Sequence, residues 1–453
     1  MRLAELAERA FERTRGQAQV TVSRERSQLA RFAGSQPTQA TEVDELQVEV
    51  LAVRDGATAA AATSEVDDAG LREVGDRAAR AAEAAARAGG GAYPGLPAPG
   101  KPPRPHDGWD PATARLEPSR PGTALTAVFE EAVARGVEAA GVWTVGAVET
   151  ALASSTGLHA SDATTDAHVK VLCRDGSGRS GFAAATATSF DAIDPAAVAR
   201  AAAEKTAGGE PARLDPGEHP AVLDADAVGS LLEFLGALAL NGLAHAEGRG
   251  ALRGRLGDLV ASPAVNLSDS PRYPSTLPRA IDAEGVAKSP LPLIQDGVAA
   301  RVVHDTRSAA MAGGGARSTG HALAPGGAPS GPQPTNLVLV GGGAADVAAL
   351  AGEIERGIYV TRLWYVNPVH AKQTLLTGTT RDGTFLIEDG RITRPLRDLR
   401  FTDSVLGLLE RVEGLTAGTR LTSAGEFYGR RFATGVVCPA IRVGALRITG
   451  ATA

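Results

Sequence analysis

Histidine and cysteine are the first residues to examine for chemistry, because both bind metals and take part in catalysis. The chain has 453 residues, with eight histidines and two cysteines. A zinc hydrolase usually places two His ligands one helical turn apart, as in His-Glu-x-x-His. Here no two histidines are three to five residues apart, and no His is followed directly by Glu. The closest approach is His245 with Glu247, where a lone His more often caps the end of a helix. The spacing therefore predicts no metal site in this chain.

The two cysteines lie in strand-like runs. Cys438 lies in VVCPAIRV and Cys173 in VLCRDG. Single cysteines in strands are usually small buried hydrophobic residues, and a nucleophile would need a nearby His that a sequence cannot show. Two cysteines also make no disulfide framework. Cys438, His245 and Glu247 remain the candidates for a catalytic group.

The densest group of chemically useful residues lies between Pro278 and His321. It contains the runs IDAEGV, LIQDGV, HDTRSA and STGHA. Asp, Glu and Gly at this density are typical of turns that hold the backbone close to a ligand, but also of ordinary surface turns between strands. Both interpretations stay open. The candidates for contact with a substrate or partner are Asp282, Glu284, Gly285, Arg307 and His321.

Two glycine runs, 313–315 and 341–343, could in principle bind phosphate. Neither has the spacing of a nucleotide-binding loop. The second follows a strand pattern and precedes a helix pattern, which also describes a tight turn, and we favour the turn. The net charge of −6 and the 4% aromatic content disfavour a nucleic-acid partner.

The opening residues lack the apolar core of a signal peptide, and no apolar run reaches the ~20 residues of a membrane span. The longest apolar stretch contains Glu233 and Asn241. We therefore expect no membrane partner and a cytoplasmic location.

An internal similarity predicts the organisation of the first half of the chain. Residues 48–56 read VEVLAVRDG and residues 169–176 read VKVLCRDG, and an Ala-rich strand pattern follows each. Each then continues through an acidic turn into an Ala- and Arg-rich helix, at 71–87 and 195–205. This order predicts a duplicated strand–turn–strand–helix module, although chance similarity of Ala-rich segments is an alternative. A Gly- and Pro-rich connector spans 89–122, and a helix is expected at 123–140.

A break in the pattern at 208–220 predicts two domains, residues 1–217 and 218–453. The second begins with one apolar helix over 225–244 and then consists mostly of short β-type runs. The predicted fold class is therefore α+β, with an N-terminal duplicated domain followed by a β-rich C-terminal domain.

Several motifs in order resemble one family. Residues 240–271 read LNGLAHAEGRGALRGRLGDLVASPAVNLSDSP, and IDAEGV, LIQDGV, HDTRSA and STGHA follow. The later runs are PTNLVLVGG, ERGIYVTRL and TFLIEDGRITRPL. Together they resemble the TldD/PmbA family, once called modulators of DNA gyrase, over nearly the whole chain.

That resemblance implies a function. In the family, a TldD-type subunit carries His-Glu-x-x-x-His on a helix and a downstream Cys as zinc ligands. A TldE-type (PmbA) partner lacks the motif and forms a heterodimer with it, and the complex degrades or trims peptides. The corresponding helix here reads SLLEFLGALALNGLAHAEGRG from Ser230, without ligands. The chain therefore resembles the TldE type, which implies no cofactor of its own, zinc in a TldD-like partner and a peptide substrate. Whether the chain forms a homodimer without the partner stays open.

Two other functions stay open. One is a stand-alone hydrolase or modifying enzyme that acts on peptide-like substrates with a divergent site, for which His245, Glu247, Asp282, Glu284 and Cys438 are the residues to mutate. The other is a binding or scaffold protein without enzymatic context.

Overall fold

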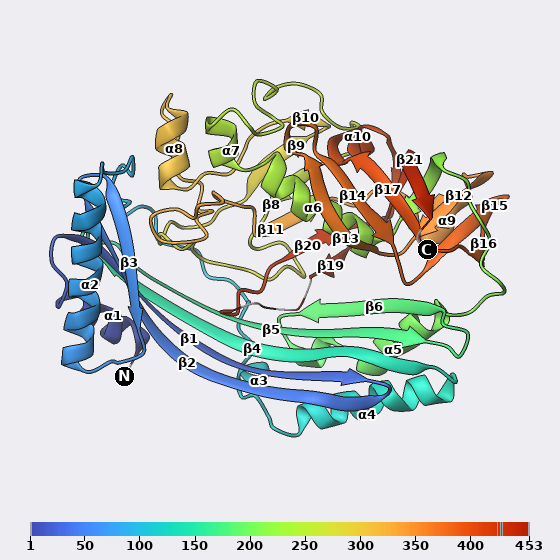
Figure 1. The fold of residues 1–453 in the computed structure, drawn as a ribbon, viewed down its shortest axis with the longest axis horizontal. Helices are drawn as coiled ribbons and strands as arrows, with labels where there is room; N and C mark the ends of the chain where they lie inside the picture. The colour runs from blue at the N-terminus through green and yellow to red at the C-terminus, as the bar shows by residue number, and fades with distance from the viewer. Residues whose placement is uncertain (1, 424, 426, 428, 452–453) are drawn as a thin grey trace.

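The computed structural model describes residues 2–423, 425, 427 and 429–451, which form three β-sheets with helices packed on and between them (Figure 1). Residues 17–187 form the first sheet, and residues from 217 onward form the other two. The predicted α+β class is confirmed. The predicted domain boundary at residue 217 remains a prediction, although strand β7 of the third sheet begins at Gly217.

The first sheet consists of six antiparallel strands in the order β3-β2-β1-β4-β5-β6. In chain order the strands are β1 (Gln17–Ala33), β2 (Gln36–Arg54), β3 (Ala57–Thr63), β4 (Glu138–Ser154), β5 (His159–Arg174) and β6 (Ser180–Ala187). The two similar runs occupy equivalent places, because each forms the end of a middle strand and the turn into an outer strand. The sheet is thus two copies of a three-stranded unit joined along β1 and β4, as the duplication predicts.

Helices flank both copies in the same order. Helices α1 (Leu3–Phe11) and α2 (Asp68–Arg87) enclose the first copy in the chain, and α4 (Arg120–Ala134) and α5 (Pro195–Glu204) enclose the second. Each pair packs on apolar side chains of alternate strand residues, such as Val20 and Val22 under the first pair and Trp143 and Val145 under the second. Since side chains alternate across a strand, both pairs cover the same face of the sheet.

The opposite face of the first sheet is polar and lies toward the C-terminal half (Figure 1). Its β1 side chains are buried although they are polar; they are Gln19, Thr21, Ser23, Glu25 and Ser27. Burial of polar groups requires hydrogen-bond partners, and segments of the C-terminal half supply several of them. The alternation in the sequence thus creates one helix-covered apolar face and one polar face that receives the second half of the chain.

Two sheets make up the C-terminal half. The second sheet has the order β10-β9-β8-β11-β20-β19, with β8 (Leu267–Asp269), β9 (Leu291–Gln295), β10 (Val298–Ala299), β11 (Asn336–Leu339), β19 (Arg420–Thr422) and β20 (Gly435–Cys438). The third has the order β13-β14-β17-β21-β7-β12-β15-β16, with β18 paired to β21. Its strands are β7 (Gly217–Leu223), β12 (Arg356–Val360), β13 (Leu363–His370), β14 (Leu375–Thr380), β15 (Thr384–Glu388), β16 (Arg391–Pro395), β17 (Leu399–Ser404), β18 (Val412–Leu415) and β21 (Ile441–Ala451).

Helix α6 (Ala225–Leu238) packs in the main core formed with these two sheets, where Leu232 and Leu235 are fully buried. The short helices are α3 (Pro111–Ala114), α7 (Gly242–Ala246), α8 (Thr306–Ala312), α9 (Val347–Ala351) and α10 (Val405–Glu410). In the part of the chain that the structure describes, no helix is both long enough and apolar enough to cross a membrane.

Two helix predictions were too long. The helix expected at 123–140 ends at Ala134, because Gly136 takes a left-handed backbone (φ 66°) and β4 begins at Glu138. The helix expected at 225–244 is two helices, since the Asn241 side chain accepts the backbone N–H groups of Leu243 and Ala244 and so starts α7. In both places the Ala- or Leu-rich sequence continues past the end of the helix, and a single residue, Gly136 or Asn241, determines where the helix ends.

Candidate functional site

A cavity of about 310 Å³ lies between the polar face of the first sheet and loops of the C-terminal half. Strands β1, β2, β4 and β5 form one wall, and residues 279–288, 320–325 and 430–432 form much of the other. Its charged or titratable lining consists of Glu49, Asp162, Arg279, Asp282, Lys288, His321, Arg430 and Arg431. Its larger apolar lining side chains are Val148, Leu152, Ile281, Leu323 and Phe432. Such a mixture of apolar wall and convergent polar groups is typical of a ligand site.

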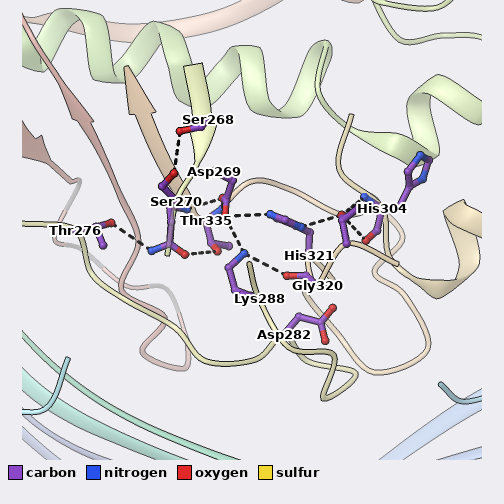
Figure 2. Close-up of polar contacts among 12 residues, drawn as sticks. Ser268, Asp269, Ser270, Thr276, Asp282, Lys288, His304, Gly320, His321 and Thr335 are labelled. Carbon is purple, nitrogen blue, oxygen red and sulfur yellow. Dashed lines mark hydrogen bonds and ion pairs between the residues drawn. The ribbon is translucent and has the colours of Figure 1, made fainter. Parts of the chain in front are cut away.

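A buried cluster of Asp269, Lys288 and His321 stands at one side of this cavity (Figure 2). Oδ1 of Asp269 lies 3.1 Å from Nζ of Lys288 and 3.1 Å from Nε2 of His321. Oδ2 of Asp269 accepts the backbone N–H groups of Thr335 and Asn336, each at 2.8 Å. Nζ of Lys288 also donates to the carbonyl oxygen of Gly320 at 3.2 Å. The cluster therefore ties β8 to three separate loops.

The electrostatics of the cluster follow from burial and pairing. Burial lowers the pKa of Lys288, and Asp269 opposes that change. Burial would raise the pKa of Asp269, but Lys288 and His321 more than offset it, so this pKa is lowered. Burial also lowers the pKa of His321, which favours a neutral ring. Asp269 is thus held as a carboxylate, and Lys288 and His321 are the two neighbours that can supply its counter-charge.

The turn at residues 282–286 holds two further buried carboxyl groups. Asp282 accepts the N–H groups of Glu284 (3.0 Å), Val286 (2.9 Å) and Ala322 (3.0 Å). Burial raises the pKa of both Asp282 and Glu284, and the charge of Asp282 raises that of Glu284 further. This pair can therefore retain a proton near neutral pH.

Glu284 is fully buried and connects three segments. Its Oε1 accepts the hydroxyl of Tyr93 at 3.1 Å, and its Oε2 accepts the backbone N–H of Thr306 at 3.0 Å and the Thr306 hydroxyl at 2.5 Å. Tyr93 belongs to the Gly- and Pro-rich connector, where it packs with Leu51 of β2. Glu284 thus fastens the connector and the start of α8 to the turn beside the cavity.

Gly285 sets how closely this turn approaches the first sheet. Its φ is 79°, and a Cβ there would lie 2.9 Å from both Cδ atoms of Leu152 and 3.0 Å from Leu158. A side chain would therefore both strain the backbone and push the turn away from β4. Glycine at residue 285 therefore lets the turn pack closely against Leu152 and Leu158 without a steric conflict.

Arginines form another wall of the cavity. Arg431 makes a bidentate ion pair with Asp166 (2.8 and 2.6 Å) and donates to the hydroxyl of Thr144 at 3.0 Å. Arg279 stacks its guanidinium over the ring of Phe432, 3.8 Å from the ring centre. No sequence pattern predicted a role for either arginine, or for Asp269 and Lys288. The only feature of the sequence that could have drawn attention to Lys288 is the scarcity of lysine, since the chain has only five.

The structure brings some predicted site residues together and separates others. Asp282, Glu284 and Gly285 share one turn, and His321 lies in the neighbouring cluster. Glu247 pairs with Arg249 at 2.5 Å at the end of α7. The lining of the cavity includes neither Glu247 nor His245, which is on the same helix.

Two more candidates are outside the lining. Arg307 lies half-buried in the first turn of α8. Cys438 is fully buried in β20, where its Sγ donates to the carbonyl oxygen of Ala225 at 3.3 Å. Burial raises the pKa of this thiol, so the thiolate form is disfavoured.

The surroundings of Cys438 test whether zinc could bind there. Arg420 lies between the nearby carboxylates, 2.9 Å from Oδ2 of Asp226 and 3.7 Å from Oδ1 of Asp224. Zinc needs deprotonated sulfur, imidazole or carboxylate ligands in a tetrahedral set. Here burial disfavours the thiolate, and the guanidinium of Arg420 already pairs with both carboxylates. Within the described residues, no three His, Cys, Asp or Glu side chains form a group that could hold a metal. These residues do not fit a zinc ion.

Comparison with known proteins then identifies the family. Residues 216–450 match the PmbA/TldA metallopeptidase C-terminal domain, and residues 123–209 match the PmbA/TldA metallopeptidase central domain. The chain belongs to the PmbA/TldD family. The resemblance inferred from the motifs is therefore confirmed.

Solved structures share the whole fold of this PmbA/TldD-family chain. TldE from Thermococcus kodakarensis has a TM-score of 0.84 at 20% identity, and covers 98% of this chain and 99% of its own. A protein from Thermotoga maritima, described as a modulator of a DNA gyrase, also has a TM-score of 0.84, at 19% identity, with 98% and 99% covered. A similarly described protein from Bacteroides thetaiotaomicron reaches 0.82 at 18% identity, with 99% and 98% covered.

A curated relative is the metalloprotease of Methanothermobacter thermautotrophicus, strain Delta H. It is 27% identical over 204 residues, which is 42% of this chain and 42% of the relative. The chain thus matches about two fifths of the length of that relative.

Proposed function

We propose that this chain is a TldE-type partner subunit of a TldD-type zinc metalloprotease complex that trims or degrades peptides, and that it holds no catalytic zinc itself. The observation that carries the proposal is the ion pair of Arg420 with Asp224 and Asp226 beside Cys438. Arg420 engages both carboxylates that lie near the one cysteine of β20, and burial disfavours the thiolate of that cysteine, so the ligands that zinc needs are not available there. The zinc of the complex would then belong to the partner.

The surface of the third sheet supports an assembly. Strand β13 is an edge strand, and it exposes Trp364 (42%) and Tyr365 (79%). Unpaired strand edges and exposed aromatic side chains are features of surfaces that bind another chain. We propose β13 as part of the contact with the TldD-like partner.

The stand-alone hydrolase has less support. Its candidate nucleophile, Cys438, is fully buried, and burial raises the pKa of the thiol. Its candidate His245 lies on α7 and is not part of the cavity lining. A peptide-binding role for the cavity needs neither residue.

Purification of the chain from its natural source tests the proposal. We expect a 1:1 complex with a chain that carries His-Glu-x-x-x-His, measured by native mass spectrometry. A variant with Trp364→Ala and Tyr365→Ala should lose much of the partner, whereas Val133→Ala, an exposed apolar residue on α4, should retain it. Recovery of the unaltered chain alone or as a homodimer, with peptidase activity, would contradict the proposal.

A further inference from the structure

Among the arginines and the lysine of the cavity lining, Arg279 is the one that has no carboxylate in contact with it within the described part of the chain. Its guanidinium lies over the ring of Phe432, and Nη2 donates to the carbonyl oxygen of Ala433 at 2.8 Å. Its Nε is enclosed and, among the described residues, has no hydrogen-bond partner. Also among those residues, no carboxylate oxygen lies within 4.0 Å of its nitrogens. Removal of a guanidinium from water is costly without an anionic partner, and Arg279 is half-buried in this state.

The other charged groups of the lining are already engaged. Lys288 pairs with Asp269, Arg431 pairs with Asp166, and Arg430 lies 4.0 Å from Glu49. Asp282 accepts three backbone N–H groups.

Asp162, the carboxylate of the lining that influences the pKa of Arg279, is engaged elsewhere. It binds His106 through Oδ1 at 2.7 Å and the backbone N–H of Ala280 through Oδ2 at 2.9 Å. The cavity therefore offers an incoming ligand one unused positive group, held in a fixed orientation by a ring.

We propose that this cavity binds a peptide through a carboxylate that pairs with Arg279. A guanidinium with free donors recognises a carboxylate by charge-assisted hydrogen bonds, which are stronger when water is excluded. The apolar wall of Val148, Leu152 and Ile281 would contact the adjoining side chain. The volume of about 310 Å³ is at the small end of ligand cavities, which suits the end of a chain rather than a folded domain. This site rests on the proposed role in handling peptides.

Short labelled peptides test the site on the full-length chain. Three probes share an N-terminal fluorophore: Ala-Ala-Leu with a free carboxylate, the same peptide as a C-terminal amide, and Ala-Asp-Leu as an amide. By fluorescence anisotropy, we expect the free acid to bind about tenfold more tightly than the neutral amide, which is the size of one charge-assisted contact. The third probe distinguishes a side-chain carboxylate from a terminal one. Equal affinity of all three, or no binding, would overturn the proposal.

Variants of the chain test whether Arg279 causes the preference for a carboxylate. Arg279→Gln should reduce the preference for a carboxylate to about twofold or less, while Arg279→Lys should retain part of it. The control is Arg430→Gln, which removes a more exposed charge of the same lining and should keep the preference. Circular dichroism confirms that each variant is folded, and the acid-to-amide comparison in the unaltered chain remains decisive if Arg279→Gln does not fold. A partner could co-purify normally while all three probes bind alike, so this test and that of the proposed function fail separately.

Discussion

Glu284 is the residue on which several parts of the molecule depend. It is fully buried, and its two oxygens bind Tyr93 of the connector and Thr306 at the start of α8. Asp282, in the same turn, adds a second carboxyl group. Burial and the neighbouring negative charge both disfavour the ionised form of a carboxyl group, so the folded turn favours a state in which one of the two groups keeps its proton. The cavity wall therefore has a protonation state that depends on pH.

This arrangement predicts a pH dependence of stability. Burial and Asp282 raise the pKa of Glu284 from its ordinary 4.5 to about 8. Between these values the folded chain binds more protons than the unfolded chain, so the free energy of unfolding falls as pH rises. Glu284→Gln removes this titration. Denaturant unfolding between about pH 7 and 8.5, above the ordinary pKa of histidine, should show the native chain losing stability relative to the variant as pH rises.

Glu247→Gln is the matched control, because Glu247 lies at the end of α7 in an ion pair with Arg249. Its unfolding free energy should follow that of the native chain across this pH range. A constant difference between the native chain and Glu284→Gln over the range would show that Glu284 does not titrate there.

At the residue scale, local patterns indicated part of this site. Acidic and Gly-rich turns predicted that Asp282, Glu284 and Gly285 lie where the backbone is held closely, and the structure places them in one buried turn. Arg279 and Lys288 were missed. Their importance depends on Phe432 and Asp269, which are distant in sequence, and no local spacing predicts such contacts.

At the element scale, the contact of the 282–286 turn with β4 depends on one glycine. Gly285→Ala should lower the free energy of unfolding by about 1–3 kcal/mol more than Gly157→Ala. The two glycines have nearly the same φ, 79° and 80°, but a Cβ at Gly157 meets no atom within 4 Å. The difference in the loss of stability therefore reports the contacts with Leu152 and Leu158. Equal losses in denaturant unfolding would mean that backbone strain alone matters.

Helices and strands could be predicted where the internal repeat and the local strand or helix pattern agreed. The repeated run, which ends in Asp-Gly in both copies and is followed by an Ala-rich strand and a helix, correctly predicted the duplicated unit of the first sheet. The long strand β4 was partly assigned to a helix, since the Ala-rich residues 138–140 fit both patterns and only pairing with β1 and β5 decides between them. The break between α6 and α7 depends on the Asn241 cap within an otherwise apolar run.

At the scale of the whole molecule, the duplicated sheet presents its polar face to the C-terminal half, and the cavity lies between them. Buried ion pairs join the halves, as Arg431 does with Asp166. The third sheet exposes β13 at one edge. We propose that peptides contact the cavity, that the partner contacts β13, and that the zinc chemistry belongs to the partner.

The zinc content of the purified natural complex tests this account most directly. Elemental analysis with protein quantification should give one zinc for each pair of chains, and Cys438→Ser should leave that value unchanged. The isolated chain should contain less than about a tenth of an equivalent after dialysis against zinc and then buffer. Stoichiometric zinc in the isolated chain, lost on Cys438→Ser, would contradict the account.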